Sequence, residues 1–394
     1  MEYTLEKVLV VSRHNIRAPL MGKGSILERM TPHAWADWGV AAGELTQHGA
    51  EMELKIGRYF ANYMEQKGLI ARNWIPKESE TRFFSNSLQR TIATARAFSC
   101  GFLPVSDVKV EYRGEFNSYQ PMFMPTFPDE SEKYRALAEC ELGRNQKGGK
   151  DGLRGIAATL TEEYRCLAEI LDLQESEEGK KGKTSFSPET SRCVYRDKSI
   201  YFAGDYENAH LLADALFMQY YELQDGKAAA FGKEVSEEDW RKLARIVDTC
   251  LETLCTSEKM SCVFAHDLLQ EILSEFQEEK RKFTFISGHD MTVLFMFSVL
   301  RARRMRLEDT FIQNSPIGMK IVFEIWHGSD QKKYVHLYAV YPGMSQICGK
   351  APLGEKDPPM SCEVVLADLE RNEKGYYSFD EIRERLEKAV QMFA

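Results

Sequence analysis

The first 112 residues alternate short apolar runs with segments of helical periodicity. Residues 7–12 are rich in valine and show little alternation of polar and apolar positions, which is typical of a buried parallel strand. Apolar side chains recur every three or four residues from Thr46 to Gly68, which predicts an amphipathic helix with Thr46 as its N-cap. The same criteria predict two more strands and a helix, over residues 81–85, 108–112 and 87–100 respectively. This strand–helix alternation predicts a parallel α/β sheet.

The pattern changes in the middle of the chain. From residue 130 to about residue 276 the periodicity is mostly helical, with few strand signals. Within this stretch, the polar segment Gln174–Pro188 predicts a solvated loop.

Strand signals return in the last third of the chain. Ser378 and Glu381 have the spacing of a capping box, which predicts the start of a final amphipathic helix. The strands of this part are predicted over residues 283–287, 319–327, 334–341 and 363–367.

The simplest organisation is an α/β fold with a mainly parallel sheet flanked by helices. Residues 1–115 and 277–394 would form one discontinuous catalytic domain, and residues 116–276 a smaller helical insertion. At 394 residues and 43% hydrophobic composition, the chain can bury a sizeable core.

Charge and cysteine content narrow the partners and the compartment. The net charge of -9 and the lack of a basic stripe disfavour a nucleic-acid partner, and no apolar run is long enough for a membrane span. The nine cysteines include no CxxC pair, which indicates neither a zinc site nor a disulfide framework and favours a reducing cytoplasm. The alternative is a periplasmic or secreted location, if the chain is a trimmed mature form. A homodimer is also compatible with the sequence.

The candidate chemistry lies at the ends of two predicted strands. Arg13, His14 and Arg17 follow the first strand directly, and His289 and Asp290 follow the strand at 283–287. Because parallel strands end at the same edge of a sheet, these side chains are expected to share one site.

These residue types together suit a phosphate. Arginine presents a planar fork that matches phosphate oxygens, and a neutral imidazole can attack phosphorus to form a covalent intermediate. Neighbouring guanidinium groups should lower the pKa of His14 and keep it neutral in mild acid. Asp290 can protonate the leaving oxygen, His289 can bind a phosphate oxygen, and Arg90, at the start of the predicted helix 87–100, adds a third guanidinium group. The scheme requires no metal or other cofactor.

The segment Arg13–Pro19 resembles the RHGxRxP motif of the histidine acid phosphatases, a branch of the phosphoglycerate mutase-like superfamily, and His289–Asp290 resembles the distal HD pair of that family. The resemblance implies that His14 is the nucleophile and Asp290 the proton donor. It also implies a set of phosphate ligands made of Arg13, Arg17, Arg90 and His289.

Within this family the chain is most similar to the bacterial glucose-1-phosphatases. Asn15 replaces the usual glycine and Leu20 follows the motif, as in those enzymes, and similarity extends over residues 219–222 and 315–323. This likeness implies that Glu222, Asn15 and Leu20 contact the substrate. Met291, after Asp290, departs from the family pattern and puts the substrate preference in question.

The leading hypothesis is a phosphomonoesterase that acts on a small sugar phosphate such as glucose 1-phosphate. A phytase-type inositol-phosphate phosphatase is the main alternative, followed by a phosphosugar mutase or transferase and by a phosphate-binding protein without turnover. His266–Asp267 is a second His-Asp pair, but it lies in a predicted helix and is expected to be structural. Trp35 and Trp38 are expected to pack a long loop onto the core rather than to stack on a sugar.

Overall fold

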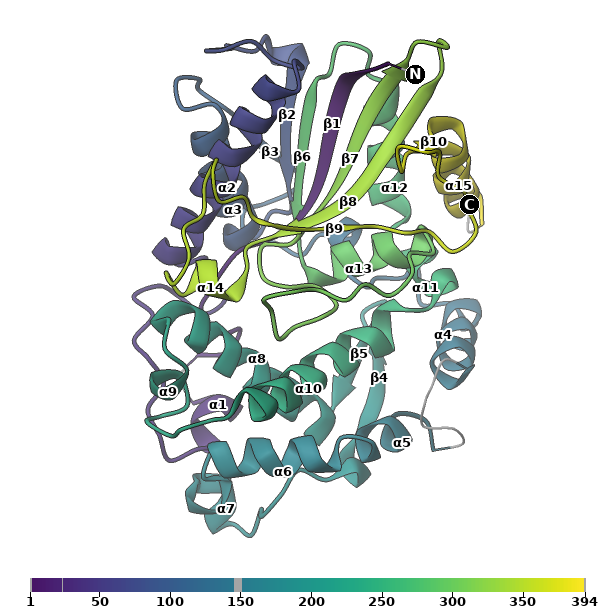
Figure 1. Cartoon of the computed structure of the whole chain (residues 1–394). Helices are drawn as coiled ribbons and strands as arrows, with labels where there is room; N and C mark the ends of the chain where they lie inside the picture. The colour runs from purple at the N-terminus through teal and green to yellow at the C-terminus, as the bar shows by residue number, and fades with distance from the viewer. Residues whose placement is uncertain (1, 23, 145–150, 393–394) are drawn as a thin grey trace.

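The structure is a computed structural model that describes residues 2–22, 24–144 and 151–392. Its centre is an eight-stranded sheet of order β10-β8-β7-β1-β6-β2-β3, with β9 paired to β8 (Figure 1). The strands of this sheet are β1 (Tyr3–Arg13), β2 (Thr81–Ser85), β3 (Val110–Tyr112), β6 (Phe283–Gly288), β7 (Lys320–Gly328), β8 (Lys333–Tyr341), β9 (Met360–Glu363) and β10 (Tyr377–Ser378).

Helices cover both faces of the sheet. Val8 and Val10 of β1 pack in one apolar cluster with α2 and α3, whereas Leu9 and Val11 pack in a second cluster with α12, α13 and α15. The helices that pack around the sheet are α2 (Gln47–Gln66), α3 (Gln89–Phe102), α12 (His266–Gln277), α13 (Asp290–Val299), α14 (Met344–Ile347) and α15 (Phe379–Gln391).

The remaining helices and a two-stranded hairpin lie below the sheet in Figure 1. The second apolar cluster continues from the sheet into this region without a break, through Leu212 and Leu243. The elements are α1 (Ile26–Arg29), α4 (Glu132–Arg144), α5 (Gly152–Ala158), α6 (Thr161–Ile170), α7 (Glu177–Lys180), β4 (Arg192–Arg196), β5 (Ser199–Ala203), α8 (Asp205–Leu223), α9 (Gly226–Ala229), α10 (Glu237–Cys255) and α11 (Glu258–Phe264).

The α/β class is confirmed, but the sheet is mixed rather than mainly parallel as predicted. β1, β6, β2 and β3 are parallel neighbours, while β7, β8, β9 and β10 run antiparallel to their partners. Only four residues connect β7 to β8, and parallel strands need a much longer crossover. β1 and β6, the two strands whose ends carry the predicted chemistry, both belong to the parallel part of the sheet.

Several local predictions differ from the structure. The hairpin β4–β5 was not expected in the helical stretch, and α7 occupies part of the loop predicted over Gln174–Pro188. The last predicted strand, 363–367, lies earlier in the chain as β9. Helix α15 begins after Ser378, but the Ser378 side chain makes no capping hydrogen bond, so the predicted capping box is wrong.

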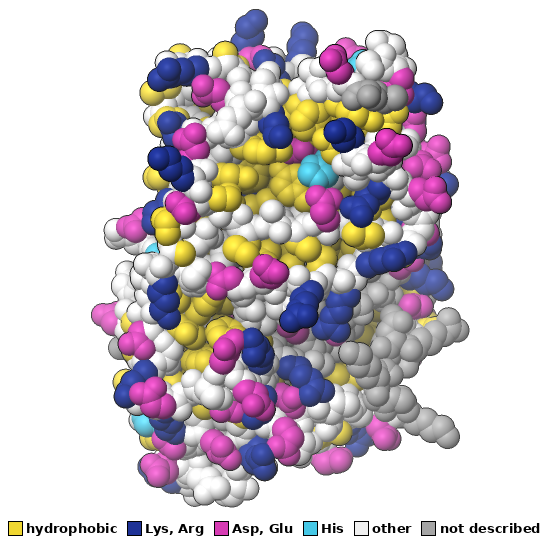
Figure 2. Space-filling view, viewed as in Figure 1, with side chains coloured by type: hydrophobic (Ala, Val, Ile, Leu, Met, Phe, Trp, Pro, Cys, Tyr) yellow, Lys and Arg dark blue, Asp and Glu magenta, His cyan; other side chains and the backbone are white. Residues whose placement is uncertain are grey.

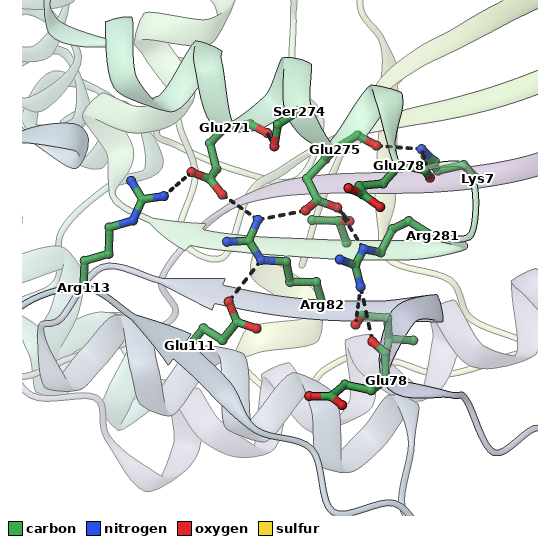
Figure 3. A network of polar contacts seen from close by, with 12 residues as sticks. Lys7, Glu78, Arg82, Glu111, Arg113, Glu271, Ser274, Glu275, Glu278 and Arg281 are labelled. Carbon is green, nitrogen blue, oxygen red and sulfur yellow. Dashed lines mark hydrogen bonds and ion pairs between the residues drawn. The ribbon is translucent and has the colours of Figure 1, made fainter.

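A network of charged groups fastens α12 to the sheet (Figure 3). Arg82 of β2 pairs through Nη1 with Glu275 Oε1 at 2.8 Å and with Glu271 Oε1 at 2.5 Å. Lys7 of β1 donates to the carbonyl oxygens of Glu275, at 2.6 Å, and Glu278, at 2.8 Å, at the end of α12. Burial lowers the pKa of Lys7 to about 8, whereas the negative charge of Glu275 favours the ammonium form.

Charges of both signs are interspersed on the face of the molecule seen in Figure 2, and apolar side chains gather over the sheet. Within the described residues, no helix combines the length and the apolar character that a bilayer crossing requires.

Candidate active site

Three parallel strands bring the predicted site residues together. Arg13 at the end of β1 is in register with Gly288 at the end of β6, and Ser85 at the end of β2 is in register with Ser287. The His14 N–H donates to the carbonyl oxygen of Gly288, 3.0 Å away. The segments that follow all three strands therefore meet at one edge of the sheet, as the sequence predicts for the first two.

His14 is held in one tautomer. Its Nδ1 lies 2.8 Å from the carbonyl oxygen of Asn15, and because a carbonyl can only accept, Nδ1 carries the proton. The lone pair is then on Nε2. Burial, with Arg90 and Arg17 nearby, holds the pKa of His14 well below its usual range, so the ring is neutral and nucleophilic in mild acid.

His289 faces the site with its Nδ1, whereas His14 leaves Nε2 free. Asn86 accepts the Ser87 N–H on its Oδ1 at 2.7 Å, so its amide nitrogen is the group that lies 2.6 Å from His289 Nε2. Nε2 therefore accepts and Nδ1 carries the proton. Arg90 Nη2 lies 3.5 Å from this Nδ1. Two donors thus converge, and an oxygen anion is the acceptor that both would share.

Three guanidinium groups surround His14. Arg13 donates to the Ser315 carbonyl, Arg17 Nη1 to the Ala18 carbonyl at 3.2 Å, and Arg90 Nη1 to the Gly43 carbonyl at 3.5 Å. The Nε atom of each of these three arginines is buried and has no hydrogen-bond partner among the described residues. Burial, and then repulsion from Arg17, lowers the pKa of Arg90 to about 9. The cluster is therefore under-neutralised, which favours binding of an anion.

Asp290 opens α13 beside this cluster. Its Oδ2 lies 3.3 Å from Arg13 Nη2, and its Oδ1 accepts the Met291 N–H at 2.8 Å. Burial opposes ionisation of Asp290, but Arg13 and then His289 outweigh it and hold the pKa of this carboxyl below its usual range. The side chain is 19% exposed, whereas Arg13, on its inner side, is 3% exposed. Asp290 thus stands at the outer side of the cluster.

Two contributors lay outside the sequence prediction. Asp214 of α8 binds Arg17, with 2.8 Å between Oδ2 and Nη2, and Asn86 orients His289. Asn86 comes within two residues of the end of a predicted strand, as His14 and His289 do, and that position could have identified it. Asp214 lies within a long helical stretch, where no motif marks it.

The three predicted substrate contacts take different places. Asn15 is completely buried and donates from Nδ2 to Glu53 Oε1 at 2.8 Å, so its side chain anchors the loop. Leu20 is 46% exposed. Its side chain lies beside Gly43, since a methyl group placed on Gly43 would be 3.4 Å from Leu20 Cδ2. Glu222, half-buried on α8, accepts the Thr46 hydroxyl at 2.7 Å.

The residues expected to be structural also have defined places. The Trp35 indole N–H donates to the Leu27 carbonyl at 3.0 Å, and both Trp35 and Trp38 pack against the core. His266 begins α12 and contacts Asp267 at 3.0 Å.

Comparison with known proteins agrees with this geometry. Residues 4–150 match the model of the histidine phosphatase superfamily (branch 2). The chain is 30% identical to a glucose-1-phosphatase of Providencia rettgeri, over 99% of this chain and 93% of that protein, and 28% identical to a glucose-1-phosphatase of Salmonella typhimurium, over 96% and 91%. The phytase structure from Citrobacter braakii superposes with a TM-score of 0.86 at 22% identity, over 100% of this chain and 98% of that one, and shows the same fold. The chain therefore belongs to branch 2 of the histidine phosphatase superfamily and is a phosphoric monoester hydrolase.

Proposed function

We propose that this chain hydrolyses a sugar phosphate, such as glucose 1-phosphate, through a phosphohistidine on His14. The observation that carries the proposal is the bond from His14 Nδ1 to the Asn15 carbonyl, which leaves Nε2 with a lone pair inside a ring of cationic groups. Nε2 forms a bond to phosphorus while the ester P–O bond breaks, and the leaving oxygen takes a proton from Asp290. Water then attacks phosphorus, its proton passes to Asp290, the P–N bond breaks, and inorganic phosphate leaves.

The phosphate ligands are Arg13, Arg17, Arg90 and His289. The Nε atoms of the three arginines have no acceptor among the described residues, and the Nδ1–H of His289 lies beside Arg90 Nη2 and can donate to the same anion. During transfer they stabilise the charge on the equatorial oxygens of the phosphoryl group.

Asp290 gains its proton through the substrate. Arg13 and His289 favour the carboxylate, but a bound phosphate brings two negative charges beside them and cancels much of this effect. The pKa of Asp290 then rises on binding. The carboxyl is thus an acid in the complex with substrate, and mild acid favours this state.

The carboxylates that α8 places near the site suit a small sugar monophosphate better than a highly phosphorylated inositol. Asp214 and Glu222 both project from α8, one onto Arg17 and the other onto Thr46 at the start of α2. Carboxylates accept hydrogen bonds from sugar hydroxyls but repel additional phosphates. The glucose-1-phosphatase relatives support the same substrate class, and inositol phosphates remain the second candidate because the phytase fold is shared.

Phosphate release from glucose 1-phosphate and from inositol hexakisphosphate tests the proposal. His14→Ala should abolish release, and His266→Ala, which alters the other His-Asp pair, should keep the parental rate. An alkaline quench during turnover should trap phosphate on His14. Substantial activity in the His14→Ala variant would remove His14 as nucleophile, and isomerised sugar phosphate without free phosphate would indicate a mutase.

We further propose that residues 116–276 act as a cap over the site. The pairs Arg17–Asp214 and Thr46–Glu222 support this, since each joins a loop or helix beside the sheet to α8. Limited proteolysis with and without inorganic phosphate tests it, because a cap should be protected when the anion is bound.

A cytoplasmic location is the compartment we propose. All nine cysteines lie in the described residues and are free thiols, a state that reducing conditions maintain. Fractionation of cells that produce the protein tests this, and a homodimer stays a prediction for light scattering to check.

A further inference from the structure

A buried ion pair lies directly beneath the loop that carries His14. Lys320 of β7 and Glu53 of α2 are each completely buried, with 2.8 Å between Lys320 Nζ and Glu53 Oε1. The Lys320 ammonium also donates to the Gly318 carbonyl at 2.8 Å, whereas Glu53 Oε2 has no partner among the described residues. Burial raises the pKa of Glu53 and lowers that of Lys320. Both shifts favour the neutral forms, so keeping the two charges here opposes stability.

This ion pair is connected to His14 through a single side chain. Glu53 Oε1 accepts from Asn15 Nδ2 at 2.8 Å, and Asn15 Oδ1 accepts the Ile16 N–H at 2.9 Å. The Asn15 N–H in turn donates to Thr94 Oγ1 at 3.2 Å. The side-chain amide of Asn15 is therefore fixed at both its nitrogen and its oxygen.

The peptide group between Asn15 and Ile16 transmits this anchoring. In a trans peptide the N–H and the C=O point in opposite directions. Because the Ile16 N–H is held by Asn15 Oδ1, the Asn15 carbonyl points the other way, onto His14 Nδ1 at 2.8 Å. The orientation of this one plane decides which imidazole nitrogen keeps its proton.

We propose that Glu53 and Lys320 are positioning residues that act through Asn15 to hold His14 in the tautomer with its lone pair on Nε2. The proposal rests on the phosphohistidine mechanism described above. It explains why a costly buried ion pair is placed next to the nucleophile: the carboxylate gives the Asn15 amide an acceptor, and the ammonium balances its charge. It also gives a role to the completely buried side chain of Asn15.

Two double variants separate positioning from simple packing. In Glu53→Leu with Lys320→Met, both charges disappear together, so no unpaired charge is left buried, but Asn15 loses its acceptor. In Glu53→Gln with Lys320→Met, the charges also disappear, but the glutamine oxygen can still accept from Asn15 Nδ2. We expect kcat of the leucine variant to fall roughly 10- to 100-fold with KM within about twofold, since misplacement of a reacting group has effects of this size. The glutamine variant should stay within about threefold of the parent.

The tautomer provides a direct readout. The ¹⁵N shifts of His14 in the parent should show a protonated Nδ1 and an unprotonated Nε2, and in the leucine variant a mixture of both tautomers. Glu275→Gln is the matched control, because Glu275 is a buried, ion-paired glutamate in the network of Figure 3. It should lower thermal stability while kcat and the His14 shifts stay parental.

Each outcome decides the proposal. Parental kcat and a single tautomer in the leucine variant would overturn it, as would equal losses in the leucine and glutamine variants. The mechanism itself is tested separately by His14→Ala: if that variant is inactive while the leucine variant behaves as the parent, only the positioning role fails.

Discussion

Arg17 Nη2 and Asp214 Oδ2 lie 2.8 Å apart, which joins the loop after β1 to helix α8. Both side chains are almost completely buried, at 4% and 9% exposure. This pair is how a helix some 200 residues away in the chain helps to aim a guanidinium group at the site. With Arg17 as a phosphate ligand, as proposed above, phosphate binding and the position of α8 would be coupled through this pair.

Replacing this carboxylate should therefore weaken catalysis. In Asp214→Ala, Arg17 loses its orienting partner, and we expect kcat/KM for glucose 1-phosphate to fall roughly tenfold, as for loss of one charge-assisted hydrogen bond. Asp214→Asn keeps an acceptor and should lose less. Steady-state kinetics of both variants check this, and an unchanged kcat/KM in Asp214→Ala would show that Arg17 needs no partner.

Asp290→Asn should separate substrates by their leaving groups. Asparagine cannot donate a carboxylic proton, so release of a sugar alkoxide should slow by roughly 10²- to 10⁴-fold, the range of general acid catalysis. Nitrophenolate needs little protonation and should be affected far less. Parallel assays with glucose 1-phosphate and nitrophenyl phosphate measure the difference, and equal losses would contradict the acid role.

Glu222→Gln should shift the substrate preference. Glutamine keeps an acceptor for the Thr46 hydroxyl but removes the negative charge of the Glu222 side chain. We expect the ratio of kcat/KM for inositol hexakisphosphate to that for glucose 1-phosphate to rise several-fold, because repulsion of the additional phosphates is relieved. An unchanged ratio would place Glu222 outside the region that the substrate reaches.

Acid should destabilise the protein when phosphate is absent from the buffer. Burial and neighbouring arginines lower the pKa values of His14 and His289 well below 6.5, so below that pH the unfolded chain binds more protons than the folded one. The contribution of these two histidines to stability is thus complete above the unfolded value of 6.5. It is lost as the pH falls from there toward the folded pKa values, by up to about 1.4 kcal/mol per pH unit for each group.

Urea unfolding between pH 7.5 and 5 measures this slope. Inorganic phosphate should restore stability, because it binds the folded form alone. His14→Ala should reduce the slope, since one of the two groups is removed. Two other groups oppose this slope: burial raises the pKa of Asp248 to about 7, and hydrogen bonds to Glu324 and Glu363 outweigh burial and raise the pKa of His336. The decisive comparison is therefore between the parent and His14→Ala, and equal slopes in the two would contradict the lowered pKa of His14.

The sequence was sufficient for the strand ends but not for contacts between remote elements. His14 and His289 follow apolar runs, and the parallel register places such positions side by side. The Arg17–Asp214 and Asn15–Glu53 contacts depend on how α8 and α2 pack, and no spacing in the chain encodes that.

The missed hairpin has a local explanation. Its turn is formed by Asp197 and Lys198, both with positive φ, at 52° and 61°. This geometry usually selects Asn-Gly or Asp-Gly, so the Asp-Lys pair gave no recognisable signal. β4 and β5 have five residues each, too few for alternation to stand out in a helical stretch.

The strand order also constrains how this protein is made. β6 lies between β1 and β2 in the sheet. The edges of β1 and β2 that face β6 therefore have no native partner until residues 283–288 have left the ribosome. At about 5–20 residues per second, the nascent chain carries these unpaired strand edges for roughly 9 to 35 s after β3 has been synthesised. The parallel part of the sheet can therefore be completed only after most of the chain has been synthesised.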